Sequence, residues 1–164
     1  MLIVMAVKTR AKPQAAKFGV IDVKLDVRID ASPAQVWRAI VRDATKWWPR
    51  DFYTGANPKA FTFEDKLGGR VYESWSNGGG LVWYDVIGVD PNRSLLMRGQ
   101  LTARYGGPAM SLLEITLEAD GKQTTLHLHD NVFGVIGAKM KDSLVAGWKL
   151  LMEDSLKKFV ESKG

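Results

Sequence analysis

An apolar stripe near the C-terminus is the feature that most constrains how this chain can fold. Apolar residues recur there at spacings of three, four and one, which places them on one wide face of a helix, while lysine and glutamate fill the other side. We therefore predict a helix over 138–162, roughly 37 Å long at 1.5 Å per residue. A helix of this length can span a whole sheet. The stripe comprises Met140, Leu144, Val145, Trp148, Leu151, Met152, Leu156, Phe159 and Val160.

A strand is predicted near the start of the chain. Between Val20 and Asp30, apolar residues alternate with charged ones, a period typical of a half-buried strand. Ahead of it, residues 1–16 show no sustained period, and we read them as an N-terminal extension to a single domain over 17–164.

Two short helices are predicted after this strand. Ser32 can cap the first helix, with Pro33 at its first position and Gln35 completing a capping box. The second begins near Asp43 and must stop before Pro49, because proline disfavours helix in the residue before it.

Turn signals divide the middle of the chain into consecutive strands. Glycine, proline and asparagine cluster at short intervals with no helical pattern between them, which predicts antiparallel strands joined by tight turns. The fold class is therefore α+β, with a curved antiparallel sheet of about seven strands around the long helix. The six strands of this region are expected at 59–66, 70–76, 81–89, 94–103, 109–119 and 123–133.

Composition excludes several functions. The chain has no cysteine, so disulfides and thiolate sites are impossible, and we expect a cytoplasmic location. The net charge of +5 comes from scattered basic residues, which argues against nucleic-acid binding. The apolar run at residues 1–7 is too short to span a membrane. Nothing in the sequence indicates the oligomeric state.

No cofactor or metal is expected. The glycine runs lack the spacing and context of phosphate-binding or dinucleotide motifs. His127 and His129 share one face of a strand, but Leu126 and Leu128 are better inward residues, which places the histidines outside. Asp130 points the other way from the histidines. One histidine pair also lacks the three ligands of a catalytic zinc.

Several local motifs resemble the START-like (SRPBCC) helix-grip superfamily. They are Ile29-Asp30-Ala31-Ser32-Pro33-Ala34-Gln35-Val36-Trp37, Trp47-Trp48-Pro49, Gly68-Gly69-Arg70-Val71-Tyr72-Glu73 and Val89-Asp90-Pro91. The branch most similar to the chain contains homologues of the activator of the heat-shock-protein ATPase and overlaps polyketide cyclase-like sequences. This resemblance covers about 17–162 and implies the helix-grip fold.

A cavity is expected between the curved sheet and the helix, since one helix does not fill the concave face. Glu73 is the one charged residue among those expected to line it, and its strand would turn it inward together with Val71 and Trp75. An enclosed carboxyl there could act as acid, base or hydrogen-bond acceptor, although the opposite phase, with Glu73 in solvent, remains open. The expected lining is Trp47, Trp48, Phe52, Phe61, Phe63, Val71, Glu73, Trp75, Trp83, Met97, Trp148 and Met152.

Three functions remain open at this point. The first is binding of a small hydrophobic or amphipathic molecule between the sheet and the helix. The second, which the resemblance allows, is a cyclase- or aromatase-type enzyme that would use Glu73, with Tyr72 or an arginine, to move protons. The third, which the name of the branch implies, is an interaction protein that regulates a chaperone ATPase.

Overall fold

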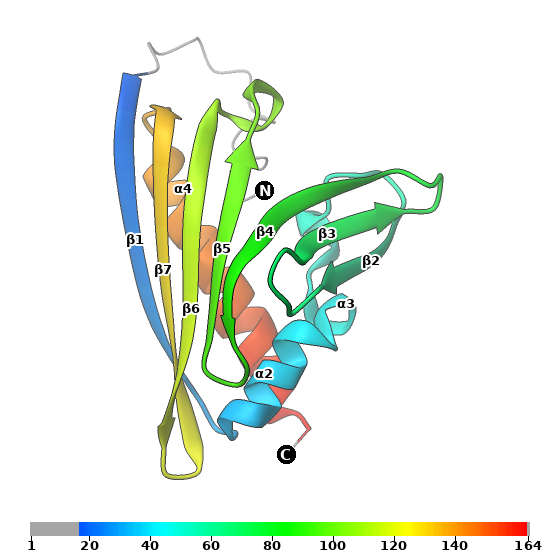
Figure 1. The fold of residues 1–164 in the computed structure, drawn as a ribbon, viewed down its shortest axis with the longest axis vertical. Coiled ribbons are helices and arrows are strands. Elements are labelled where there is room, and N and C mark those ends of the chain that lie inside the picture. The colour runs from blue at the N-terminus through cyan, green and yellow to red at the C-terminus, as the bar shows by residue number, and fades with distance from the viewer. Residues whose placement is uncertain (1–16, 164) are drawn as a thin grey trace.

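The computed structural model describes residues 17–163 and contains one antiparallel sheet of seven strands (Figure 1). The strands follow the order β1-β7-β6-β5-β4-β3-β2 across the sheet. They are β1 (Lys17–Ile29), β2 (Pro58–Phe63), β3 (Arg70–Trp75), β4 (Gly80–Asp90), β5 (Ser94–Leu101), β6 (Ala109–Asp120) and β7 (Gln123–Ile136). The helical segments are α2 (Pro33–Val41), α3 (Ala44–Trp47), η1 (Arg50–Phe52), η2 (Ala103–Tyr105), α4 (Met140–Lys149), η3 (Leu150–Lys157) and α5 (Lys158–Glu161).

The α+β helix-grip architecture predicted from the sequence is confirmed. All seven strands and both short helices occur near their predicted places, and the long helix runs from Met140 to Glu161 rather than over 138–162. Three strand ends differ: β2 stops at Phe63, β5 stops at Leu101 before the short turn η2, and β7 continues to Ile136. The predicted extension, residues 1–16, lies outside the described residues.

The capping box of α2 forms as its sequence predicts. The Ser32 side chain accepts a hydrogen bond from the Gln35 backbone N–H at 3.4 Å, and the Gln35 side chain accepts one from the Ser32 N–H at 2.9 Å. These reciprocal bonds satisfy two donors at the helix start. Helices α2 and α3 then carry the chain from β1 at one edge of the sheet to β2 at the other (Figure 1).

The sheet curves because its middle strands are irregular. The β3–β4 register shifts between Val71 and Tyr72, and the β4–β5 register shifts between Val86 and Gly88. An extra residue at such a point bends a strand and increases its twist. Figure 1 shows β4 bending away from the long strands β5, β6, β7 and β1, so that β2 and β3 lie at an angle to them.

The C-terminal helix lies across the sheet with its apolar stripe buried (Figure 1). Its middle segment, η3, is a π-helix, a wider turn than the sequence pattern predicts. The Ser155 hydroxyl donates to the Leu150 carbonyl, five residues earlier, at 3.1 Å. The buried residues of the stripe are Met140, Leu144, Trp148, Leu151, Met152, Leu156 and Val160.

Replacing Leu156 by alanine tests the packing of this helix. Leu156 is fully buried, so Leu156→Ala should lower the free energy of unfolding by about 2–5 kcal/mol, as buried leucine truncations do. Leu150 lies in the same segment but is 39% exposed, and Leu150→Ala should cost less than about 1 kcal/mol. Urea unfolding of both variants measures the difference, and equal losses would show that the stripe does not anchor the helix.

Candidate functional site

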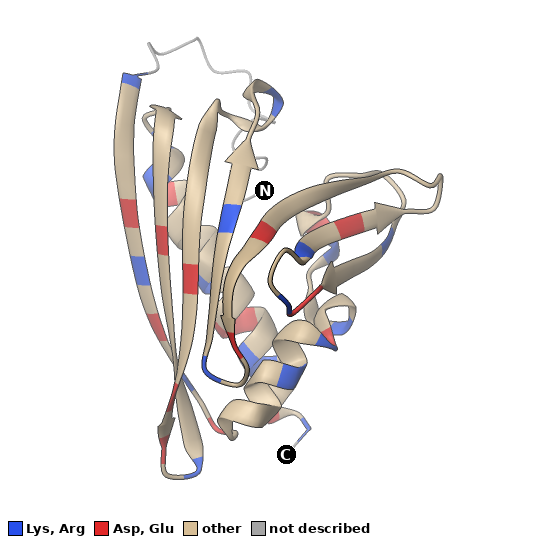
Figure 2. Ribbon diagram, in the orientation of Figure 1, with Lys and Arg blue, Asp and Glu red and all other residues tan. Residues whose placement is uncertain are grey.

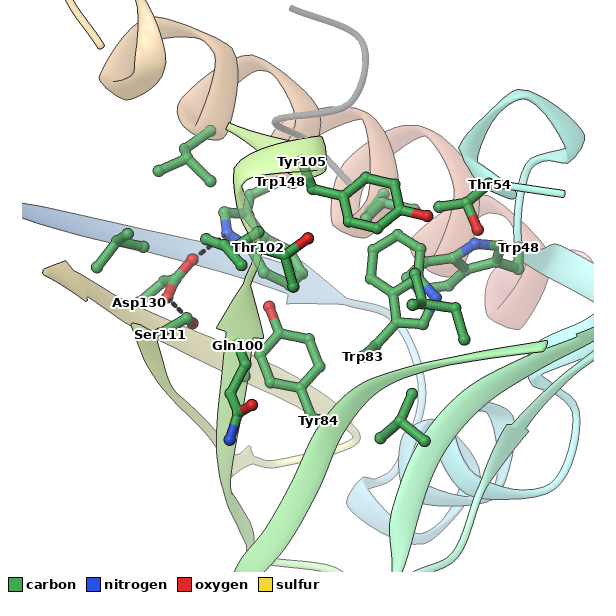
Figure 3. A pocket seen from close by; sticks show the side chains of 17 residues that line it. Trp48, Thr54, Trp83, Tyr84, Gln100, Thr102, Tyr105, Ser111, Asp130 and Trp148 are labelled. Carbon is green, nitrogen blue, oxygen red and sulfur yellow. Dashed lines mark hydrogen bonds between the residues drawn. The ribbon is translucent and has the colours of Figure 1, made fainter. Parts of the chain in front are cut away.

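A pocket of about 180 Å³ lies between α4 and the inner faces of β4, β5, β6 and β7. Polar side chains gather at two ends: Asp130, Ser111 and Trp148 at one, Trp48, Thr54 and Trp83 at the other (Figure 3). The full lining is Trp48, Thr54, Leu81, Val82, Trp83, Tyr84, Gly99, Gln100, Leu101, Thr102, Tyr105, Ser111, Asp130, Val132, Leu144, Trp148 and Leu151.

Asp130 is the buried charged group of this pocket, with 1% of its surface exposed. It lies on the inner face of β7, in line with the buried Leu126 and Leu128. The Ser111 hydroxyl donates to one carboxylate oxygen at 2.6 Å, and the Trp148 indole N–H donates to the other at 2.9 Å (Figure 3). Burial raises the pKa of Asp130 above its ordinary value, and these two hydrogen bonds partly offset the increase.

Tyr84 approaches the same group from β4. Burial raises the pKa of Tyr84 far above its ordinary value, the nearby charge of Asp130 adds to the increase, and a hydrogen bond with Ser111 opposes it. Its ring crosses Gly99 of the neighbouring strand, where a Cβ atom would lie 2.8 Å from the ring edge. Glycine at this position therefore leaves room for the Tyr84 ring to reach the pocket. The raised pKa keeps the phenol protonated, so its hydroxyl can donate a hydrogen bond there.

An aromatic cluster closes the other end of the pocket. Trp48 stacks on Phe61 with ring centroids 3.7 Å apart, and Trp83 stands nearly perpendicular to both rings, with its centroid 5.7 Å from each. The indole N–H groups of Trp48 and Trp83 are buried and have no hydrogen-bond partner among residues 17–163. A buried donor left unpaired costs about 1–3 kcal/mol, so these two indoles are a local cost to the stability of the fold.

Glu73 points inward and is fully buried, which settles the phase that the sequence left open. Its carboxylate accepts hydrogen bonds from the Thr54 N–H at 2.9 Å, the Thr54 hydroxyl, the Gly55 N–H at 3.2 Å and the Trp75 indole at 2.8 Å. These donors occupy the carboxylate, and Glu73 is absent from the lining of the pocket. Its geometry is that of an anchor that ties the loop at Thr54 and Gly55 to β3.

The residues expected to line one cavity are divided among several places. Trp48, Trp83 and Trp148 line the pocket. Phe52 and Met97 are fully buried in the core, and Trp75 is half-buried, with its ring directly over Gly55. A separate void of about 20 Å³ in the core is bordered by Trp47, Phe61, Phe63, Val71 and Met152, together with Trp48 and Trp148.

The sequence did not lead us to predict the polar half of the pocket. Asp130 was predicted to point away from the two histidines, but not to line the cavity. Strand alternation from Leu126 and Leu128 was the available signal, because it turns Asp130 inward as well. No local pattern distinguishes the other polar lining residues, which are Tyr84, Gln100, Thr102, Tyr105 and Ser111.

The two histidines lie on the opposite, outer face of the sheet. His127 pairs with Asp26 at 2.7 Å and with Glu118 at 3.2 Å, and His129 pairs with Asp22. No group of three or more histidine or acidic residues in the described part of the chain is arranged to hold a metal ion. Basic and acidic residues are interspersed along the strands and helices (Figure 2).

Comparison with known families assigns the chain to one of them. Residues 30–161 match the family described as activator of Hsp90 ATPase homolog 1-like protein. The chain belongs to this family. The START-like (SRPBCC) resemblance stated from the sequence is thereby confirmed. No curated protein matches the chain significantly. Among residues 17–163, no helix is long and apolar enough to cross a membrane.

Solved structures share the fold of this family member at low sequence identity. An uncharacterised protein from Rhizobium leguminosarum has a TM-score of 0.68 and 16% identity, covering 91% of this chain and 99% of its own. CalU16 from Micromonospora echinospora has a TM-score of 0.58 and 22% identity, covering 90% and 84%. DynU16, a protein of the dynemicin biosynthetic locus, has a TM-score of 0.62 and 21% identity, covering 87% and 48%. At these identities the likeness concerns the fold.

The buried acid predicts a pH-dependent stability difference. Because the folded state holds the proton of Asp130 more tightly than the unfolded state, its contribution to stability falls as pH rises from about 4 through the raised pKa. Asp130→Asn removes this loss. The unfolding free energy of the variant relative to wild type should therefore improve over this range, by about 1.4 kcal/mol for each unit of pKa shift. Urea unfolding at several pH values measures it.

Asp22 on the outer face provides a control of opposite sign. A hydrogen bond with His129 lowers the pKa of Asp22, so its contribution is present at neutral pH and is lost as pH falls through the folded pKa. The unfolding free energy of Asp22→Asn should therefore fall relative to that of wild type as pH rises. Parallel trends for the two variants would contradict the environment assigned to Asp130.

The anchoring role of Glu73 is tested by Glu73→Gln. An amide retains one acceptor oxygen but turns an NH₂ group toward the donors of the loop, so the variant should be destabilised by about 1–3 kcal/mol. Glu64 is the matched control, because its half-buried carboxylate accepts a single backbone hydrogen bond, from Arg70 at 2.9 Å. Thermal and urea unfolding should show a smaller loss for Glu64→Gln. An unchanged stability for Glu73→Gln would rule out the anchor.

Proposed function

We propose that this protein binds a small, mainly apolar molecule in the pocket between the sheet and α4. The observation that carries the proposal is the composition of the lining, in which apolar and aromatic walls surround one buried, hydrogen-bonded acid, Asp130. Ligand sites commonly combine apolar walls with a few convergent polar groups. The absence of cysteine fits a cytoplasmic location for such a binding protein.

Packing considerations support binding over simple core filling. The void in the core beside Trp47 and Phe63 has a volume of only about 20 Å³. The pocket is about nine times larger, at about 180 Å³. Well-packed interiors rarely leave spaces of this size, and polar groups facing an unfilled space do not stabilise a fold. A bound molecule accounts for both features.

The cyclase-type enzyme remains the second candidate, with a different proton-transfer group. Asp130 lies in the pocket with a raised pKa, beside the phenol of Tyr84. A buried acid whose pKa is shifted and that faces a ligand pocket is a common property of acid–base sites. Glu73, by contrast, is occupied by loop donors.

Binding is tested with prodan, an uncharged naphthalene ketone whose emission depends on its surroundings. The wild-type protein should bind it saturably at one site. Leu101 is half-buried and lines the pocket, so Leu101→Trp should fill the space and weaken binding by about tenfold or more. Leu112, on the outer face of β6 and 38% exposed, is the control, and Leu112→Trp should bind as wild type does. Equal binding by all three proteins, or no saturable binding, would refute the proposal.

A further inference from the structure

On the basis of the proposed function, we infer that the pocket selects a compact, uncharged molecule that carries both hydrogen-bond donors and acceptors, and that Asp130 makes it reject carboxylates. The volume sets the size of this ligand. A cavity of about 150 Å³ holds one benzene ring, and this pocket has about 180 Å³. A molecule of one ring or two fused rings therefore fits, whereas a long fatty acid or a sterol would extend outside.

The absence of positive charge from the lining excludes an anionic ligand. None of the lining residues, all of which lie within the described part of the chain, is lysine, arginine or histidine. Arg98, Arg104 and Lys149 are adjacent in sequence to lining residues but do not line the pocket themselves. Arg98 pairs with Asp85 at 3.2 Å, and Arg104 lies over the Tyr105 ring at 5.6 Å. A carboxylate that entered the pocket would give up its hydration without gaining a cation, which is strongly unfavourable.

Asp130 adds a specific reason to reject a carboxylate and accept a donor. Each of its oxygens accepts one hydrogen bond from the protein, from Ser111 or from Trp148. A carboxylate oxygen can accept a second bond, so both oxygens can still receive a hydroxyl or amide N–H of a ligand. A ligand carboxylate would instead bring a second acceptor, and a like charge, next to the first.

The remaining polar groups favour an uncharged acceptor on the same molecule. Tyr84, Gln100, Thr102 and Tyr105 supply hydroxyl and amide groups that donate and accept. A carbonyl oxygen can accept from these groups while a donor on the same ligand reaches toward Asp130 (Figure 3).

Two probes of nearly the same shape separate these possibilities, 2-naphthamide and 2-naphthoate. The amide is uncharged and carries a donor and an acceptor, while the carboxylate is an anion at pH 7.5. Isothermal titration calorimetry of the wild-type protein should give binding of the amide tighter by about tenfold or more, equivalent to about 1.4 kcal/mol. Binding of the carboxylate equal to or tighter than that of the amide would overturn the inference.

Asp130→Asn tests the residue to which the selection is assigned. Asparagine can accept from the Trp148 indole and donate to the Ser111 hydroxyl, so the fold should be retained. The variant should narrow the preference for the amide to about threefold or less, a change of about 0.7 kcal/mol or more. Glu114→Gln removes an exposed carboxylate from the outer face of the adjacent strand β6 and should keep the wild-type preference. A full preference retained by Asp130→Asn would overturn the role of Asp130.

A second variant keeps the test decisive if Asp130→Asn does not fold. Thr102 is exposed and lines the pocket, so Thr102→Lys supplies a cation without disturbing the core and should tighten binding of 2-naphthoate relative to the amide. An unchanged ratio would contradict the electrostatic basis of the selection. The outcomes distinguish this inference from the proposed function. If prodan binds but neither naphthalene probe does, the inferred ligand class is wrong. If no probe binds, the pocket is not a binding site and the proposed function is refuted.

Discussion

Burial of the C-terminal helix against the concave face of the sheet is the interaction on which the rest of the structure depends. The stripe from Met140 to Val160 supplies much of the apolar surface of the core, and burial of such surface is the main favourable contribution to folding. The sheet must curve to enclose the helix, and the irregular register around β4 produces that curvature. The pocket occupies space that the helix leaves unfilled against the bent sheet.

The pocket combines two environments that depend on different parts of this arrangement. Its acidic end is held by the long strands β6 and β7 and by Trp148 on the helix. Its aromatic end is held by the segment after α3, by β2 and by β4, which supply Trp48, Phe61 and Trp83 to one cluster. Glu73 secures the intervening loop by accepting its backbone N–H groups. The site is therefore built mainly on strands and a helix, and only Trp48, Thr54 and the segment at Thr102 and Tyr105 belong to connections.

Periodicity in the sequence was sufficient to predict the fold, because burial of alternate residues in strands and of one face in helices leaves a direct signature. Residue size placed Trp48, Trp83 and Trp148 among the candidates for the lining. It could not separate them from Phe52 or Met97, since side chains that fill a core and those that border a space have the same chemistry. Most donors to Glu73 come from a loop without any regular pattern, and the apolar stripe does not distinguish the π-helical segment η3 from an α-helix. Asp130 was accessible to the alternation argument, but its partners were not, because they come from residues 19 and 18 positions away.

The hydrogen bonds of Asp130 also constrain how this protein can change in evolution. Ser111, Asp130 and Trp148 lie on two strands and the helix, and each is buried. Loss of the carboxylate alone would leave the indole N–H and the hydroxyl without an acceptor, and loss of either donor would leave a desolvated charge less well compensated. Replacement of one of the three alone by an apolar residue is therefore costly, whereas joint replacement by apolar residues of similar volume is not. The three positions should therefore be substituted together. In related sequences we expect their identities to covary, even where the surrounding apolar residues vary independently.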